Sequence, residues 1–159
     1  MRQNFLSKEE QMSLQLWHRN GWLKPHKTTP SQIAELFAIV DRDLADARSA
    51  RLSVDWQFGI AYNATLKLCT ILLYAEGYRT EKSLAHYRTL QALPLILGSK
   101  YNNDADYLDA CRSKRNTAEY DSAGQINKEE AEELVSFAQE LRSAVLEWLH
   151  SNHPQLSAR

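Results

Sequence analysis

The sequence predicts an all-α fold, an up-and-down bundle of five to six helices with short connections and no strand. Glycine and proline are scarce, at five and four in 159 residues, whereas all-β and loop-rich folds use many turn residues. Apolar residues recur at steps of three and four along most of the chain, as amphipathic helices require. Residues that start and stop helices stand at the ends of these apolar runs.

Two helices are expected at the start of the chain. The first opens at a capping box of Ser7 and Glu10 and spans about residues 8–20. The second starts at Thr29, which is followed by proline at the first helical position, and runs to about Ala50. The segment between these two helices is expected to form a loop.

The third helix is expected to lie at the centre of the bundle. It begins at its cap, Ser53, and ends at Gly77. Its apolar residues cover nearly the whole circumference, so it is either buried in the bundle or covered in part by a second subunit. Its most apolar stretch, Leu66 to Ala75, is interrupted by Lys67 and is too short to span a bilayer. No membrane association is therefore expected.

A fourth and a fifth helix are expected to follow. The fourth, over about residues 84–97, should end or kink at Leu93, because the residue before a proline avoids the helical conformation. The fifth should begin at a cap at Asn102 or Asn103 and end near Gly124.

The last helix completes a single domain that takes in the whole chain of 159 residues. Asn127, with glutamate three residues later, is expected to cap this helix, which should end before Pro154. The core of the domain is expected over about residues 29–150. Residues 152–159 are expected to form a mobile tail, as chain ends commonly do.

Composition limits the classes of function. A formal net charge of −1 gives no global basic field of the kind that marks many nucleic-acid-binding proteins. Cys69 and Cys111 have no metal-ligand spacing and are expected to be reduced core thiols. The charged run from Ser7 to Glu10 interrupts any apolar segment of a signal peptide, so a cytoplasmic protein is expected. The sequence indicates neither a metal set nor a cofactor motif.

One segment, residues 109–124, concentrates the groups that bind phosphate or transfer protons. Within it Arg115 falls on the apolar stripe of its helix, together with Leu108 and Cys111. An unpaired guanidinium on a core face would cost several kcal/mol. Arg115 is therefore expected to have either a partner or a function.

The other polar residues of this segment extend the candidate site. Arg112, Asn116 and Glu119 share a sector of the helix with Arg115, and Tyr120 lies beside them. Arginine forks suit phosphate oxygens. The alternative is that these residues form ordinary helix pairs at i, i+4, worth a few tenths of a kcal/mol each. Further candidate contacts to phosphate are Lys114, Asp121 and His86.

His86 is treated as a candidate because an arginine and a second aromatic residue lie next to it in the chain. It could face the same cleft as Arg115. The alternative is that His86 is an ordinary surface histidine of its helix.

A long apolar helix followed by a helix with Arg-x-x-Arg-Asn-x-x-x-Tyr-Asp resembles the HEPN family of helical nucleotide-binding domains. The resemblance covers roughly residues 15–150 and is closest to bacterial stand-alone members. The motifs that carry it are Cys111-Arg-Ser-Lys-Arg-Asn116, Asp43-Leu-Ala-Asp46, Ala61-Tyr-Asn-Ala64, Ala75-Glu-Gly-Tyr78 and His86-Tyr-Arg-Thr-Leu90.

The resemblance implies a homodimer whose two motif helices face each other across a cleft that binds RNA or nucleotide phosphate. Many members are metal-independent ribonucleases of toxin–antitoxin, antiphage or RNA-processing systems, and toxin members are often paired with a nucleotidyltransferase antitoxin. Arg115 and Asn116 match the first part of the catalytic pattern. The position of the usual histidine is held by Tyr120.

This substitution leaves two functions open. In the first, the protein cleaves RNA, with Arg115 on the scissile phosphate, Asn116 positioning it and Tyr120 assisting. In the second, it is a non-catalytic module that binds a nucleotide, an RNA end or a partner such as a nucleotidyltransferase. A tyrosine, with a reference pKa of about 10, transfers protons near neutral pH only if its pKa is lowered.

Overall fold

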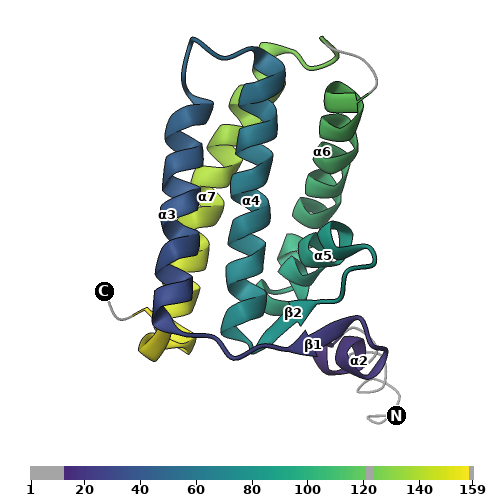
Figure 1. Cartoon of the computed structure of the whole chain (residues 1–159), viewed down its shortest axis with the longest axis vertical. Helices are drawn as coiled ribbons and strands as arrows, with labels where there is room; N and C mark the ends of the chain where they lie inside the picture. Colours follow the sequence, from purple (N-terminus) through teal and green to yellow (C-terminus); the bar gives the residue numbers. More distant parts are fainter. Residues whose placement is uncertain (1–12, 121–123, 158–159) are drawn as a thin grey trace.

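Four long helices alternate in direction along the molecule (Figure 1). They are α3 (Pro30–Ala47), α4 (Val54–Ala75), α6 (Asn102–Tyr120) and α7 (Lys128–Asn152). The computed structural model describes residues 13–120 and 124–157, without the side chains of Glu119 and Tyr120. With 76% of the structure helical, the expected all-α bundle is confirmed.

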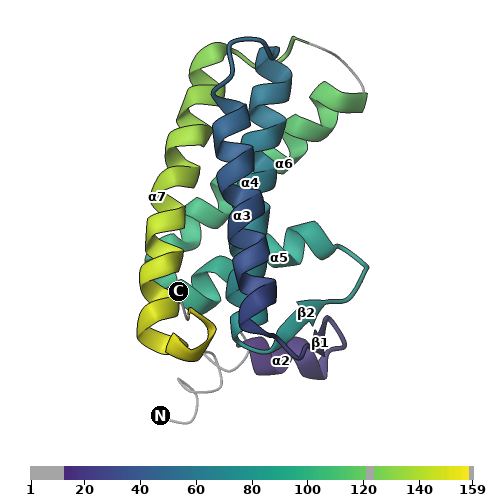
Figure 2. The ribbon, with the colours of Figure 1, turned by 60° about the vertical axis from the view of Figure 1, so that its left-hand side comes forward.

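Helix α4 is the centre of the bundle. It packs against α3 and α7 on one side and against α5 (Ala85–Leu97) and α6 on the other, an arrangement visible in Figures 1 and 2. Thirteen of its 22 residues are buried. By length and composition α4 could cross a membrane, but 72% of its apolar window is buried inside the bundle. The apolar helix is thus longer than the Leu66–Ala75 stretch that the sequence indicated.

Local capping signals position three of the long helices. The backbone N–H of Gln32 donates to the Thr29 hydroxyl at the start of α3, at 3.2 Å. The N–H of Glu130 donates to the Asn127 side chain at the start of α7, at 2.8 Å. The Ser53 hydroxyl accepts in the same manner from the backbone N–H of Trp56, in the first turn of α4. Each such cap contributes about 1 kcal/mol, and all three were expected from the sequence.

The expectation that the chain forms no strand is wrong. Strand β1 (Leu23–Pro25) pairs with β2 (Tyr78–Thr80) in an antiparallel sheet of two strands. The expected loop after the first helix therefore contains a strand. Three residues are too few to show a period of two in the sequence, and the partner strand follows α4, far along the chain.

A small helix and the sheet form one end of the molecule. Helix α2 (Leu14–Arg19) starts at Ser13, whose hydroxyl accepts from Leu16 N–H. The capping box at Ser7 and Glu10 lies outside the described residues. Leu23 of β1 is 1% exposed and packs with Leu73 of α4 and Ala92 of α5. This small apolar cluster attaches the sheet to the main bundle.

Helix α5 has nearly the bounds expected from the sequence, about residues 84–97. It continues through Pro94 to Leu97, so of the two expectations for Leu93, an end or a kink, the end is wrong. Leu93 is fully buried, and its packing offsets the roughly 3 kcal/mol cost of proline inside a helix. The residue before the helix, Leu84, has a left-handed backbone (φ 53°) and no side-chain cap. A short 3₁₀ turn, η1 (Ser99–Tyr101), then leads into α6.

The C-terminal segment packs against the bundle. Pro154–Leu156 forms a 3₁₀ turn, η2, and Leu156 is only 9% exposed within the main core. The His153 ring lies 2.6 Å from a carboxylate oxygen of Glu76, at the end of α4. Residues 154–156 are thus packed, whereas the expected mobility of residues 152–159 stays a prediction.

The packed C-terminus makes Leu156→Ala a test of the fold. Removing a nearly buried leucine side chain should lower the free energy of unfolding by about 2 kcal/mol, at the lower end of such core truncations. Gln155→Ala, at the exposed neighbouring position, is the matched control and should change it by less than about 0.5 kcal/mol. Urea denaturation measures both, and equal stabilities for the two variants would contradict the packing.

Candidate functional site

Five polar or charged side chains gather where α4, α5 and α6 meet. Helix α6 supplies Arg112 and Arg115, α5 supplies His86, and α4 supplies Tyr62 and Lys67. Arg115 and Tyr62 are in direct contact, and the other residues are related to them through their charges. The charges of Arg115 and Arg112 act on both His86 and Tyr62, and the charge of Lys67 acts on His86. We refer to these five residues as the basic cluster.

Stacking on Tyr62 explains how Arg115 is accommodated on an apolar stripe. Its helical neighbours Leu108 and Cys111 are 0% and 4% exposed, as the stripe predicts. The guanidinium carbon of Arg115 lies 5.3 Å from the centre of the Tyr62 ring. A cation over an aromatic ring gains about 0.5–2 kcal/mol, depending on its desolvation. The aromatic ring of α4 thus offsets part of the cost of placing a guanidinium on the packed side of α6.

The hydroxyl of Tyr62 is buried and has no hydrogen-bond partner in the described part of the chain. Burial raises the pKa of this phenol, and the charges of Arg115 and Arg112 oppose the rise only in part. The group is therefore a protonated hydrogen-bond donor. A buried donor without an acceptor costs about 1–3 kcal/mol.

His86 lies at the exposed edge of the basic cluster. Partial desolvation lowers its pKa, and the positive charges of Arg115, Arg112 and Lys67 lower it further. The ring is consequently neutral near pH 7, so one of its nitrogens can accept a proton. A neutral imidazole beside two guanidiniums is an arrangement suited to general base catalysis on a phosphate ester.

Arg112 and Lys114 form ion pairs with residues of different helices, so they do not belong to the same site. Nε of Arg112 donates to a carboxylate oxygen of Asp109 at 2.8 Å, one helical turn earlier. Only Nε takes part in that hydrogen bond, and the side chain is 30% exposed. Lys114 instead pairs with Glu130 of α7. The structure therefore keeps Arg112 in the basic cluster and directs Lys114 toward the other side of α6.

The remaining sequence-predicted residues lie at the end of α6. Asn116 is half-buried one residue after Arg115. The side chains of Glu119 and Tyr120, and the whole of Asp121, lie outside the described residues. The cluster itself brings together Arg112, Arg115 and His86 from the expected set.

Sequence reasoning missed Tyr62 and Lys67. Tyr62 stands in an apolar run, so its position has the pattern of a core residue. Its ring is indeed buried. Lys67 carried a usable signal, because a lysine within an otherwise apolar helix must direct its ammonium group toward water or an anion. The structure places it half-buried on α4, close enough to affect the pKa of His86.

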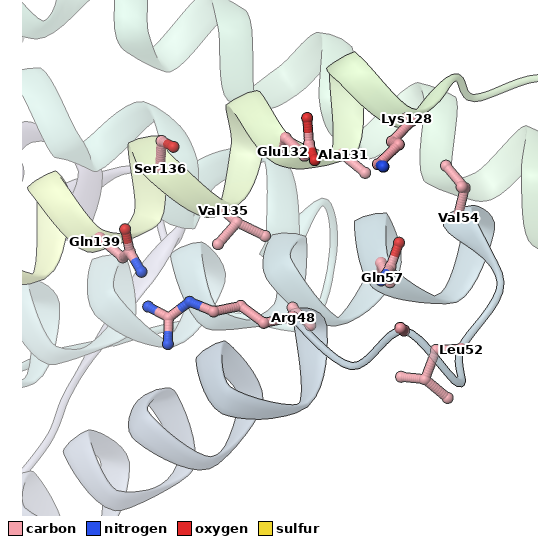
Figure 3. Close-up of a pocket in the computed structure, with 12 residues that line it drawn as sticks. Arg48, Leu52, Val54, Gln57, Lys128, Ala131, Glu132, Val135, Ser136 and Gln139 are labelled. Atoms are coloured by element: carbon pink, nitrogen blue, oxygen red, sulfur yellow. The ribbon is translucent and has the colours of Figure 1, made fainter.

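A large hollow lies elsewhere in the molecule. It has a volume of about 770 Å³ and opens between the end of α3 and the starts of α4 and α7. Figure 3 shows Arg48, Gln139, Glu132 and Lys128 around it, a lining of mixed charge. It contains none of the residues expected from the sequence. We place the candidate site at the basic cluster, because cooperating charged and titratable groups meet there.

No group of three or more histidine, cysteine, aspartate or glutamate side chains is arranged to hold a metal ion within residues 13–120 and 124–157. The side-chain groups of the basic cluster are guanidinium, ammonium, imidazole and phenol groups.

The unpartnered hydroxyl predicts an unusual response to Tyr62→Phe. This change removes a buried donor without removing the ring on which Arg115 lies, so the free energy of unfolding should stay the same or rise by up to about 1 kcal/mol. Tyr107→Phe on α6 is a matched control, because the Tyr107 hydroxyl interacts with Cys111 and Glu133 and its loss should destabilise. Thermal or urea denaturation compares the two, and a marked destabilisation by Tyr62→Phe would show that the hydroxyl has a structural partner.

Comparisons with known proteins add no relative to this picture. No family model matches the chain, and neither the curated proteins nor the solved structures give a match. The resemblance to the HEPN family therefore stays a prediction from the motifs of the sequence.

Proposed function

We propose that the protein binds RNA phosphate at the basic cluster and cleaves RNA without a metal ion, as a HEPN-like ribonuclease. The observation that carries this proposal is the position of Arg115 on the ring of Tyr62, with its charge and that of Arg112 acting on His86 of α5. His86 would provide a neutral imidazole from a different helix, whereas the motif of α6 has Tyr120 instead of the usual histidine.

The chemistry assigned to these groups is transesterification. His86 accepts the proton of a ribose 2′-hydroxyl, and the resulting oxygen attacks the adjacent phosphorus. Arg115 and Arg112 stabilise the charge that develops on the phosphorane oxygens. The buried ring of Tyr62 holds the guanidinium of Arg115 in position. The 5′-oxygen leaves and takes a proton from water, so the products are a 2′,3′-cyclic phosphate and a 5′-hydroxyl end.

The biological setting of the proposal comes from the resemblance alone. It comprises a cytoplasmic homodimer in a toxin–antitoxin or antiphage system, with a nucleotidyltransferase-type protein as partner. In this arrangement two copies of α6 face each other, and Asn116 and Tyr120 contribute to a cleft shared by the two subunits.

A second candidate, a non-catalytic HEPN-like binding module, is favoured by the contacts of the two arginines. Arg112 is paired with Asp109, and Arg115 lies on the ring of Tyr62. If these contacts are the main role of the arginines, the cluster stabilises a seam between subunits. The protein would then bind a nucleotide or a partner without cleaving RNA.

Cleavage of total RNA and tRNA in the presence of EDTA tests the first candidate. Arg115→Ala and His86→Ala should each lower the rate by about 10²-fold or more, the usual size of such contributions. Arg51→Ala, an exposed arginine in the α3–α4 connection, is the control and should leave the rate unchanged. Tyr120→Phe measures the contribution of the phenol at the histidine position.

The outcomes of this assay separate the two candidates. Intact RNA with folded, dimeric wild-type protein would exclude the ribonuclease and leave the binding module. In that case Arg115→Ala should weaken the dimer or lower its stability, because the binding module gives Arg115 a structural role.

The pH profile of cleavage provides an independent test of His86. Because the pKa of His86 is lowered below its usual value of 6.5, kcat/KM should stay high at neutral pH. It should fall only as the pH drops below 6.5 and the ring becomes protonated. Lys67→Gln removes one of the charges that lower this pKa and should move the acidic limb to higher pH. Lys128→Gln, at the start of α7, is the control, and an identical shift in both variants would contradict the assignment.

A further inference from the structure

One end of the molecule is strongly basic although the whole chain carries a net charge of −1. This end consists of α2, β1, β2 and the first turn of α5, which lie together in Figure 1. Within residues 13–29 and 77–88 it contains a single acidic residue, Glu81. Its six basic residues are Arg19, Lys24, Lys27, Arg79, Lys82 and Arg88. We call this surface the basic end.

The sheet places two of these charges directly opposite each other. Lys24 of β1 and Arg79 of β2 are cross-strand partners, and both side chains are exposed. Like charges at such positions destabilise a sheet. No described residue forms an ion pair with Lys24, Lys27, Arg79 or Lys82. These four charges are therefore not paired within the described residues, and a polyanion would relieve the repulsion between them.

Aromatic groups are interleaved with these charges. The guanidinium of Arg88 lies 4.3 Å from the centre of the Trp22 ring. Trp22 is half-buried and also packs edge-on against Trp17, with ring centres 5.9 Å apart. Tyr87, the neighbour of Arg88, is 39% exposed. Aromatic rings and guanidinium planes accept unpaired bases by stacking, which double-stranded nucleic acid does not offer.

The first turn of α5 joins the basic end to the basic cluster. Three consecutive residues point in different directions around this helix. His86 is affected by the charges of the arginines of α6, and Tyr87 is exposed. Arg88 lies on Trp22 of the basic end. A strand that crosses the start of α5 would therefore pass from one surface to the other.

We propose that the basic end binds single-stranded RNA and directs it toward the basic cluster. This inference rests on the proposed action on RNA, but it uses residues outside the candidate catalytic site. Phosphates lie along Lys24, Arg79 and their basic neighbours, and an unpaired base stacks on Tyr87.

Charge reversal at Arg79 tests this surface without harming the fold. In Arg79→Glu the new carboxylate lies opposite Lys24, so the sheet should be at least as stable as in the wild type. Arg51→Glu makes the same change of charge at the opposite end of the bundle and is the matched control. Thermal denaturation of both variants confirms that any loss of binding is not a loss of folding.

The probe is a fluorescein-labelled oligouridylate of about 20 nucleotides, longer than the site size of typical single-strand-binding domains. Binding is followed by fluorescence anisotropy in the Arg115→Ala background, in which cleavage during the titration is slowed. At about 0.1 M salt Arg79→Glu should weaken binding at least about tenfold and reduce the dependence of affinity on salt. Arg51→Glu should bind as the parent does, and Tyr87→Ala should weaken binding without changing the salt dependence.

Other outcomes overturn the inference. Equal affinities of Arg79→Glu and the parent would show that the basic end is not the binding surface. A duplex of the same length that binds as tightly as the single strand would exclude single-strand recognition. Binding to phosphatidylserine vesicles that Arg79→Glu abolishes, with no effect on RNA, would assign the surface to anionic membranes.

Failure of this inference differs from failure of the proposed function. If cleavage depends on His86 and Arg115 while Arg79→Glu cleaves and binds normally, the catalytic role of the basic cluster is supported. RNA binding by the basic end is then excluded. If the oligouridylate binds through Arg79 but the wild-type protein does not cleave RNA, the role of the basic end is supported and the proposed ribonuclease activity is excluded.

Discussion

The need to bury α4 on all sides determines the rest of the structure. A helix that is apolar around its circumference can be covered only by neighbours on every face. The pair α3 and α7 covers one side and the pair α5 and α6 covers the other, while the small sheet closes the end near Leu73. Two of the polar groups that α4 carries, Tyr62 and Lys67, therefore act on residues of the covering helices. The candidate site is a consequence of how this central helix is enclosed.

The basic cluster combines stabilising and unfavourable contacts. Arg115 gains from its position on the Tyr62 ring, and Arg112 gains from its pair with Asp109. The Tyr62 hydroxyl has no acceptor in the described structure, and His86 is next to charges that oppose its protonation. A negatively charged ligand beside His86 and the two arginines would offset the second feature, the concentration of positive charge. Such unsatisfied groups collect at binding sites because a folded protein can tolerate only a few of them.

Features that depend on near neighbours in the sequence could be predicted, and features that depend on distant ones could not. The caps at Thr29 and Asn127 were predictable, because each is a contact over three residues. The pairing of β1 with β2 was not, since the two strands are separated by α3 and α4. The sequence singled out Arg115 as a residue that needed a partner, but Tyr62 resembled any core aromatic. Its role depends on which face of α4 meets α6.

The pairing of β1 with β2 ties the start of α3 to the end of α4, so the basic end exists only when these helices are packed. Local opening of the sheet would separate Lys24 from Arg79 and release Leu23 from its contact with Leu73. By thermodynamic linkage, a ligand that binds only the assembled surface stabilises every element required to form it. Occupation of the basic end would thus raise the free energy of unfolding of the bundle, including helices that never touch the ligand.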